Sequence, residues 1–127
     1  PNKRMLSSMS PTIVEENGKL RMVIGTPGGS TIITSVLQCM LNVFEYGMTM
    51  QESVSKPRFH HQWLPDDVMF EPKGFDPAVI AKLKAKGYVP KEENFVIIGR
   101  VDAILVEKDG TLEGGADPRG DDVAAGY

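Results

Sequence analysis

The chain has 127 residues, a formal net charge of −3 and a hydrophobic fraction of 41%, which fits one domain or one part of a larger one. The charge is mild and mixed in sign, which excludes nucleic acid and an anionic membrane as implied partners. The longest apolar stretch is interrupted by polar residues and is no membrane span, and the single cysteine excludes an internal disulfide. Because the first residue is Pro1 and not Met, we expect a piece of a longer protein.

The first element expected along the chain is a β-hairpin. Two β-rich runs, residues 11–15 and 19–25, flank the dipeptide Asn17-Gly18. Asn-Gly between such runs is the strongest short signal for a two-residue hairpin turn. We therefore predict two antiparallel strands joined at this dipeptide.

A long apolar helix is expected next, after a glycine-rich turn. Ser30 is predicted as its N-cap, and the helix runs to about Tyr46, where Gly47 ends it. Apolar residues cover most of its circumference: Ile32, Ile33, Val36, Leu37, Cys39, Met40, Leu41, Val43 and Phe44. A helix of this kind lies between two layers rather than on a surface.

Shorter elements are expected in the second half. We predict a short helix at 50–55, an ordered loop at 58–66 and a strand at 67–71. A second helix is expected from the N-cap Asp76, with Pro77 in its first position, to Gly87. Two β runs at 95–98 and 101–107 follow, and the turn Asp109-Gly110 leads into a strand near 111–115. The order of hairpin, helices and β-meander predicts an α+β fold with sheets packed against helices.

The glycine turn Gly25-Thr26-Pro27-Gly28-Gly29 is the best chemical candidate on local physics. A strand that ends in such a turn and opens into a helix aims free backbone N–H groups at one point, and the helix dipole adds partial positive charge there. That arrangement can hold a phosphate, a carboxylate or a developing oxyanion. A nucleotide-binding loop is excluded because Gly29 stands where a lysine is needed. A plain tight turn before a buried helix is an equally good interpretation.

Other polar groups give weaker signals. Ser7 and Ser8 have the hydroxyls to bind a carboxylate, with Arg4 or Lys3 supplying charge, but the residues alone favour an ordinary polar loop. The His60-His61 pair lacks a third metal ligand at usual spacing, so we expect a structural loop and no metal or cofactor. No nucleophile emerges from the spacing of Ser, His and Asp residues.

Four segments carry a resemblance to a known family. In chain order, PNKRMLSSMSPTIV, GTPGGSTIITSVLQ, PRFHHQWLPD and GADPRGDDVAAGY resemble the C-terminal part of the small subunit of γ-glutamyltransferases (γ-glutamyltranspeptidases), in their bacterial form. The resemblance runs over residues 1–127, which would be a single, incomplete domain. It implies an N-terminal-nucleophile hydrolase with a four-layer αββα sandwich, completed by the large subunit and the N-terminal part of the small subunit. It also implies autocatalytic processing and a periplasmic or extracellular location.

The resemblance implies an activity and two site roles. The family cleaves γ-glutamyl amides such as glutathione with a Thr at the N-terminus of the small subunit, and passes the acyl group to water, an amino acid or a peptide. That Thr would lie upstream of Pro1, so the chain alone is expected to be inactive and, with its apolar surface uncovered, to self-associate. Ser7 and Ser8 match the pair that binds the α-carboxylate of the donor. Gly28 and Gly29 match the pair whose backbone amides form the oxyanion hole.

Other interpretations remain open. Within the superfamily they are a cephalosporin (glutaryl) acylase and a depolymerase of poly-γ-glutamate, and outside catalysis a non-catalytic fragment or module. We take the pair Ser7-Ser8, as a site for an α-carboxylate, to favour the γ-glutamyltransferase.

Overall fold

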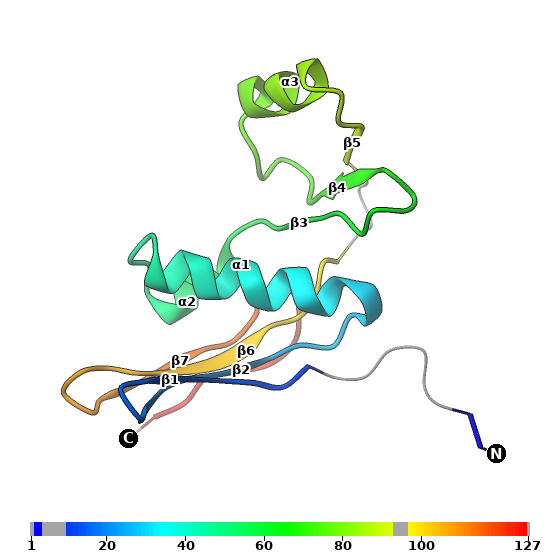
Figure 1. Cartoon of the computed structure of the whole chain (residues 1–127). Coiled ribbons are helices and arrows are strands. Elements are labelled where there is room, and N and C mark those ends of the chain that lie inside the picture. Colours follow the sequence, from blue (N-terminus) through cyan, green and yellow to red (C-terminus); the bar gives the residue numbers. More distant parts are fainter. Residues whose placement is uncertain (1, 4–9, 93–96, 127) are drawn as a thin grey trace.

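The computed structural model describes residues 2–3, 10–92 and 97–126. Within these ranges it contains a four-stranded sheet, a three-stranded sheet and three α-helices. Figure 1 shows the larger sheet at one end of the molecule, helices α1 (Ile32–Phe44) and α2 (Met50–Ser55) on one of its faces, and the smaller sheet with helix α3 (Pro77–Ala85) beyond them. The predicted α+β class is confirmed.

The larger sheet has the strand order β1-β2-β6-β7, and every neighbouring pair is antiparallel. Its strands are β1 (Thr12–Glu16), β2 (Lys19–Gly25), β6 (Asp102–Val106) and β7 (Leu112–Gly115). Asn17 and Gly18 join β1 to β2 with φ values of 53° and 72°. Two positive φ values are typical of a type I′ turn, whose twist matches that of the strands. The predicted hairpin is confirmed.

The core lies between this sheet and helices α1 and α2. It consists of Met22, Ile24, Ile32, Val36, Cys39, Met50, Val54, Val101, Ala103 and Leu105. Alternate residues of β2 and β6 point into it because successive side chains of a strand face opposite sides. Cys39 is fully buried in this core, and burial raises the pKa of its thiol.

The start of the long helix differs from the prediction. Ser30 is not its N-cap: Gly29–Thr31 form a 3₁₀ turn, and α1 begins at Ile32 without a side-chain cap. The carbonyl of Gly28 accepts hydrogen bonds from both the N–H and the hydroxyl of Thr31, at 3.1 and 3.0 Å. These bonds tighten the first turn into 3₁₀ geometry. The predicted end is confirmed, since Gly47 has a φ of 65° and its N–H donates to the Val43 carbonyl.

The smaller sheet has the order β3-β4-β5, with β3 (Phe59–His60) antiparallel to β4 (Val68–Phe70) and β4 parallel to β5 (Pro90–Glu92). Helix α3 connects β4 to β5, and its N-cap Asp76 accepts from the Ala78 N–H at 2.8 Å, as predicted.

The sequence expectations for this region differ from the structure in several places. The loop expected at 58–66 contains β3, and β5 was missed, because short strands are defined by their partners more than by local pattern. The strand expected at 95–98 falls partly outside the described residues, and residues 97 and 98 are not in a strand.

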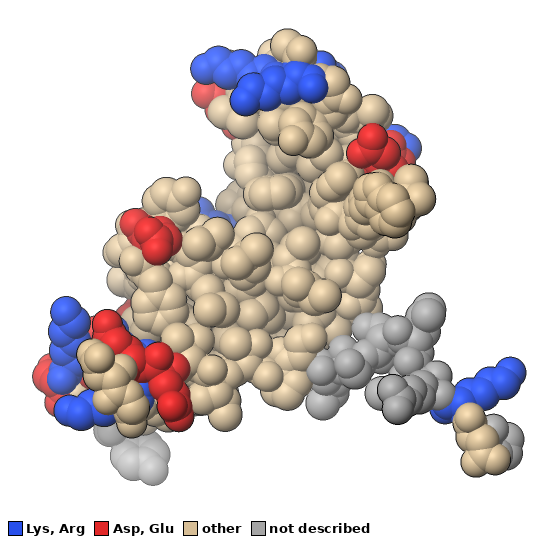
Figure 2. Space-filling view, in the orientation of Figure 1, with Lys and Arg blue, Asp and Glu red and all other residues tan. Residues whose placement is uncertain are grey.

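Two apolar faces are left uncovered by the described residues. The outer face of the larger sheet exposes Ile13, Val23, Ile104 and Leu112, and the outer stripe of α1 exposes Ile33, Leu37, Leu41 and Phe44. The exposed fractions reach 66% at Ile13 and 70% at Ile33. Figure 2 shows a broad uncharged surface over α1, with charged side chains gathered over α3 and at one end of the larger sheet. Uncovered apolar surface of this extent is typical of a face that contacts other protein.

We expect the isolated 127-residue chain to self-associate, because each Å² of apolar surface left in water costs about 25 cal/mol. Light scattering should show more than one copy per particle, together with binding of a hydrophobic dye. The double variant Ile33→Lys, Leu37→Lys changes two exposed positions and should reduce both signals. A monodisperse wild-type monomer with a cooperative melt and no dye binding contradicts this expectation.

Candidate functional site

The candidate site is the turn that leads from β2 into α1. Gly28 has a φ of 147° and Gly29 a φ of 58°. Both values lie in the region that residues with a Cβ rarely adopt, so the backbone here requires glycine. The local sequence explains the turn: Pro27 restricts the chain after β2, and the two glycines reverse it into the 3₁₀ turn that opens α1.

The backbone N–H groups of Gly28 and Gly29 are adjacent and available. Both residues are exposed, and neither N–H donates to any described residue. Free N–H groups at the start of a helix are a ready site for negative charge. The predicted glycine turn is therefore present, and its use as a site for an anion or oxyanion stays a prediction.

The two glycines differ in the space around them. A Cβ at Gly29 would meet no atom within 4 Å, so the turn is open on that side. A Cβ at Gly28 would lie 2.6 Å from the Thr31 hydroxyl oxygen and 3.4 Å from the Gly99 Cα. Gly28 is thus required for packing as well as for its φ, and Gly29 faces the side from which a ligand can approach.

A loop from the other end of the chain supports the turn from behind. Gly99 has a φ of 73°, and a Cβ there would lie 2.6 Å from Ser35 Oγ and 2.9 Å from Thr26 Oγ1. The Arg100 N–H donates to Thr26 Oγ1 at 2.7 Å, and Ser35 Oγ donates to the Ile98 carbonyl at 3.2 Å. Sequence reasoning missed this support, since only the fold brings residues 98–100 to the turn.

Behind that loop lies a buried cluster of four charged side chains. Arg58 donates to Asp117 at 2.7 Å, and Arg119 pairs with both Glu71 and Asp117. Arg58 and Asp117 are each only 1% exposed. Arg58 also donates to the Ile98 carbonyl at 3.0 Å, so the cluster contacts the supporting loop directly.

The cluster sets the ionisation of its carboxylate. Burial alone would raise the pKa of Asp117, but hydrogen bonds from the N–H groups of Val101 and Arg119 and from the two guanidinium groups outweigh it and lower that pKa. The hydrogen bonds that Arg119 donates to the carboxylates of Glu71 and Asp117 likewise raise the pKa of Arg119 against the effect of burial. Asp117 is therefore a buried anion.

The remaining predicted site residues fall into two groups. Ser7 and Ser8 lie outside the described residues. His60 is buried, with Nδ1 2.8 Å from Thr34 Oγ1 and Nε2 3.1 Å from Gln62 Oε1, while His61 pairs with an exposed carboxylate, that of Asp66. Among the described residues no three His, Cys, Asp or Glu side chains are placed to hold a metal ion. Both histidines thus contact polar side chains of this chain.

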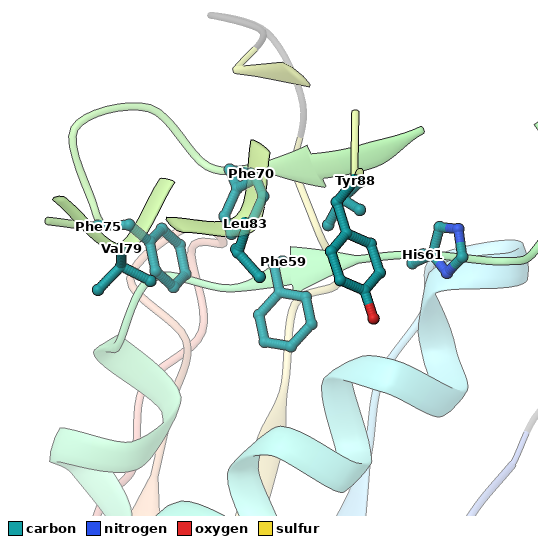
Figure 3. Close-up of a pocket in the computed structure, with 8 residues that line it drawn as sticks. Phe59, His61, Phe70, Phe75, Val79, Leu83 and Tyr88 are labelled. Carbon is teal, nitrogen blue, oxygen red and sulfur yellow. The ribbon is translucent and has the colours of Figure 1, made fainter. Parts of the chain in front are cut away.

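An apolar pocket between the smaller sheet and α3 was not predicted. Figure 3 shows Phe59 and Phe70 from the sheet facing Phe75, Val79 and Leu83 across this pocket. The volume of the pocket is about 380 Å³. The Phe70 and Phe75 rings meet edge to face at 4.9 Å. His61 and Tyr88 are the polar residues of its lining, and the other lining residues are apolar.

Comparison with known proteins extends over the whole chain. A family model described as gamma-glutamyltranspeptidase matches residues 1–127. The glutathione hydrolase proenzyme of Escherichia coli (strain K12) is 52% identical over 129 residues, which cover 100% of this chain and 22% of that protein. The chain therefore spans about a fifth of the length of this curated relative.

Solved structures agree. The T380A mutant of the Helicobacter pylori gamma-glutamyltranspeptidase is 47% identical, with a TM-score of 0.85 over 94% of this chain and 64% of that one. The Pseudomonas nitroreducens gamma-glutamyltranspeptidase complexed with L-DON is 40% identical, with a TM-score of 0.88 over 100% of this chain and 66% of that one. The fit confirms the expected fold class, an α+β part of an αββα sandwich.

In the complete protein, Asp117→Ala is expected to lower the free energy of unfolding by about 3–5 kcal/mol, because it leaves the charge of Arg58 buried without its partner. The exposed Asp121 offers a matched control, and Asp121→Ala should stay within about 0.5 kcal/mol of wild type. Urea denaturation of the three proteins measures the difference. Equal midpoints for the two variants would show that the cluster does not stabilise the fold.

The same comparison has a pH dependence. The pKa of Asp117 is lower in the folded state than its ordinary value. Its stabilising contribution is therefore complete above about pH 4 and is lost as the pH falls through the folded-state pKa. The gap in stability between wild type and Asp117→Ala should narrow over that acidic range and stay constant at neutral pH.

Proposed function

This chain belongs to the gamma-glutamyltranspeptidase family, and on that premise we propose that the complete protein cleaves γ-glutamyl amides such as glutathione. It transfers the γ-glutamyl group to water, an amino acid or a peptide. The observation that carries the proposal is the pair of exposed N–H groups at Gly28 and Gly29, which donate to no described residue and lie in the turn that leads into α1. These groups form the oxyanion hole.

The chemistry requires such a pair. Attack on the γ-carbonyl carbon converts the carbonyl oxygen into an oxyanion, and donors that are already oriented stabilise it without reorganising. Backbone amides suit this task because they carry no charge of their own and their direction is set by the fold. The positive end of the α1 dipole adds to the effect. The nucleophile, a Thr with a free α-amine as its base, is supplied by the part of the protein outside this chain.

The donor is recognised through its carboxylate. Ser7 and Ser8 bind the α-carboxylate of the γ-glutamyl group through their hydroxyls. A glutaryl group ends in a carboxylate at the same position and lacks only the α-amine. The serine pair therefore does not distinguish a γ-glutamyl donor from a glutaryl donor, contrary to the expectation from sequence. The α-amine distinguishes them, because only the γ-glutamyl group carries it.

The partners are the other parts of the same precursor. The large subunit and the N-terminal part of the small subunit cover the outer stripe of α1 and the outer face of the larger sheet, which the described residues leave exposed. None of the helices in the described ranges has the length and apolar character needed to cross a membrane. We place the protein in the periplasm or outside the cell, as its family resemblance implies.

The proposal is tested with three chromogenic anilides and the complete protein. We expect turnover of the γ-glutamyl anilide, and much slower turnover of the glutaryl anilide, which lacks the amine. The double variant Ser7→Ala, Ser8→Ala should raise KM for the γ-glutamyl anilide, since a hydrogen bond to a charged group contributes about 1.5–3 kcal/mol, and should leave kcat nearly unchanged.

The 4-aminobutyryl anilide is the matched control, because it keeps the amine and lacks the carboxylate. Its rate should be low and equal in wild type and in the double serine variant. Preference for the glutaryl anilide would replace the proposed activity by that of an acylase. An unchanged KM with a collapsed kcat would show that the serines do not bind the carboxylate.

The oxyanion role of the glycines is tested by adding side chains. The side chain of Gly29→Val meets no neighbouring atom, but a β-branched residue rarely adopts the φ of 58° found here, so the backbone must turn. We expect kcat per folded molecule to fall by about 10²–10³, the effect of one lost oxyanion donor, together with a lower melting temperature. Gly28→Ala should lower both, because its Cβ collides with Thr31. A plain structural turn predicts normal activity per folded Gly29→Val molecule.

A further inference from the structure

Resting on the proposed oxyanion role of Gly28 and Gly29, we propose that Thr26 and Thr31 are positioning residues that fix the directions of the two N–H groups. A peptide unit is planar, and in a trans unit the N–H and the C=O point in opposite directions. The only cis peptide bond among the described residues is Leu64-Pro65. A hydrogen bond that holds the carbonyl of a peptide unit therefore also fixes where its N–H points.

Thr26 holds the first of the two peptide units. Its hydroxyl donates to the Pro27 carbonyl at 2.7 Å. That carbonyl shares a peptide plane with the N–H of Gly28, so the hydrogen bond keeps this N–H turned to the opposite side. Gly28 needs such a restraint, because glycine rotates about its backbone bonds more freely than any other residue.

Thr31 holds the second unit. Its hydroxyl and its N–H both donate to the Gly28 carbonyl, at 3.0 and 3.1 Å. This carbonyl shares a plane with the N–H of Gly29. Each N–H of the glycine pair is thus set by a threonine hydroxyl on the far side of its own peptide unit.

The Thr26 hydroxyl is itself oriented by the supporting loop. Thr26 Oγ1 accepts the Arg100 N–H at 2.7 Å. A hydroxyl has one hydrogen to donate, and with Arg100 approaching the acceptor side that hydrogen is directed to Pro27. Gly99 leaves space for this arrangement, since a Cβ at Gly99 would lie 2.9 Å from Thr26 Oγ1.

The two threonines contribute to catalysis without touching the substrate. An oxyanion hole accelerates a reaction because its donors already point at the place where charge develops. Removing either hydroxyl leaves the donor in place but takes away a restraint on its plane. The effect should be larger at Thr26, because the Thr31 N–H still holds the Gly28 carbonyl when the Thr31 hydroxyl is removed. The expected loss is in kcat and not in ground-state binding, because the donors act on charge that forms in the transition state.

The experiment replaces each threonine in the complete protein. Thr26→Val and Thr31→Val remove the hydroxyl at constant shape, and Thr26→Ser and Thr31→Ser keep it. We expect kcat per folded, processed molecule to fall about 10-fold or more in the valine variants, with KM within about twofold of wild type, and to recover in the serine variants. Thr111→Val, at an exposed position where the hydroxyl bonds to the exposed Asp109 and not to the glycine turn, is the matched control and should have the kcat and KM of wild type.

A crystal structure of each valine variant gives a readout that does not depend on activity, maturation or stability. The Pro27–Gly28 plane should be rotated, or present in two orientations, in Thr26→Val, and the Gly28–Gly29 plane in Thr31→Val. Unchanged planes, or normal kcat in both valine variants, would overturn the proposal.

The failures are separable. If Gly29→Val retains full activity, the oxyanion role itself is wrong. If Gly29→Val is inactive while Thr26→Val and Thr31→Val behave as wild type, only the positioning role is wrong.

Discussion

The buried contact between Arg58 and Asp117 is the constraint on which the rest of this structure depends. Two charges that are both almost wholly withdrawn from water persist only if each is neutralised and hydrogen-bonded. Here Asp117 accepts hydrogen bonds from two arginine side chains and two backbone N–H groups. The guanidinium of Arg58 also donates to the backbone carbonyls of Val54 and Ile98. The segment after β7, the end of α2 and the start of the smaller sheet must therefore meet at one place.

This meeting point is physically continuous with the candidate site. Arg58 fixes the Ile98 carbonyl, and the next residue, Gly99, packs against Thr26 and Gly28 at the turn. Asp117 holds the other side of the same loop through the Val101 N–H at 2.7 Å. The loop is therefore held on one side by charges and presents backbone to the turn on the other. A short glycine-rich turn, which has little stiffness of its own, gains rigidity from this support.

Features that depend on neighbours in sequence were predictable. The type I′ hairpin follows from Asn17-Gly18, and α3 from the cap Asp76 and the proline after it, because each signal acts within a few residues. Helix α2 had an equally local signal that was overlooked: Thr49 and Glu52 form a capping box, with each side chain bonded to the other's backbone N–H. Ser30 misled because it has the cap residue type without the cap geometry.

Features that depend on distant partners were not predictable. Strand β5 is short and polar, and it is a strand only because β4 lies beside it. In the site, the glycine pair was found from its motif, and Thr26 and Thr31 flank that pair closely enough to have been considered. Gly99 and Asp117 had no such signal, since their roles exist only once the fold has brought the supporting loop and the segment after β7 to the turn.

This chain combines a hydrogen-bonded region around the glycine turn with apolar faces that the described residues leave exposed, and each has a use in a larger protein. The turn, its supporting loop and the charge cluster are joined by hydrogen bonds within this chain, and under the positioning proposal these bonds set the direction of the two N–H groups. The outer stripe of α1 and the outer face of the larger sheet are exposed apolar surfaces. Burying them against the rest of the precursor is favourable because it removes apolar surface from water. Under the proposed function, assembly then brings the nucleophile to an oxyanion hole that needs no further adjustment. Because the donors are fixed before assembly, the free energy of covering the apolar faces can be used to position the nucleophile rather than to order the hole.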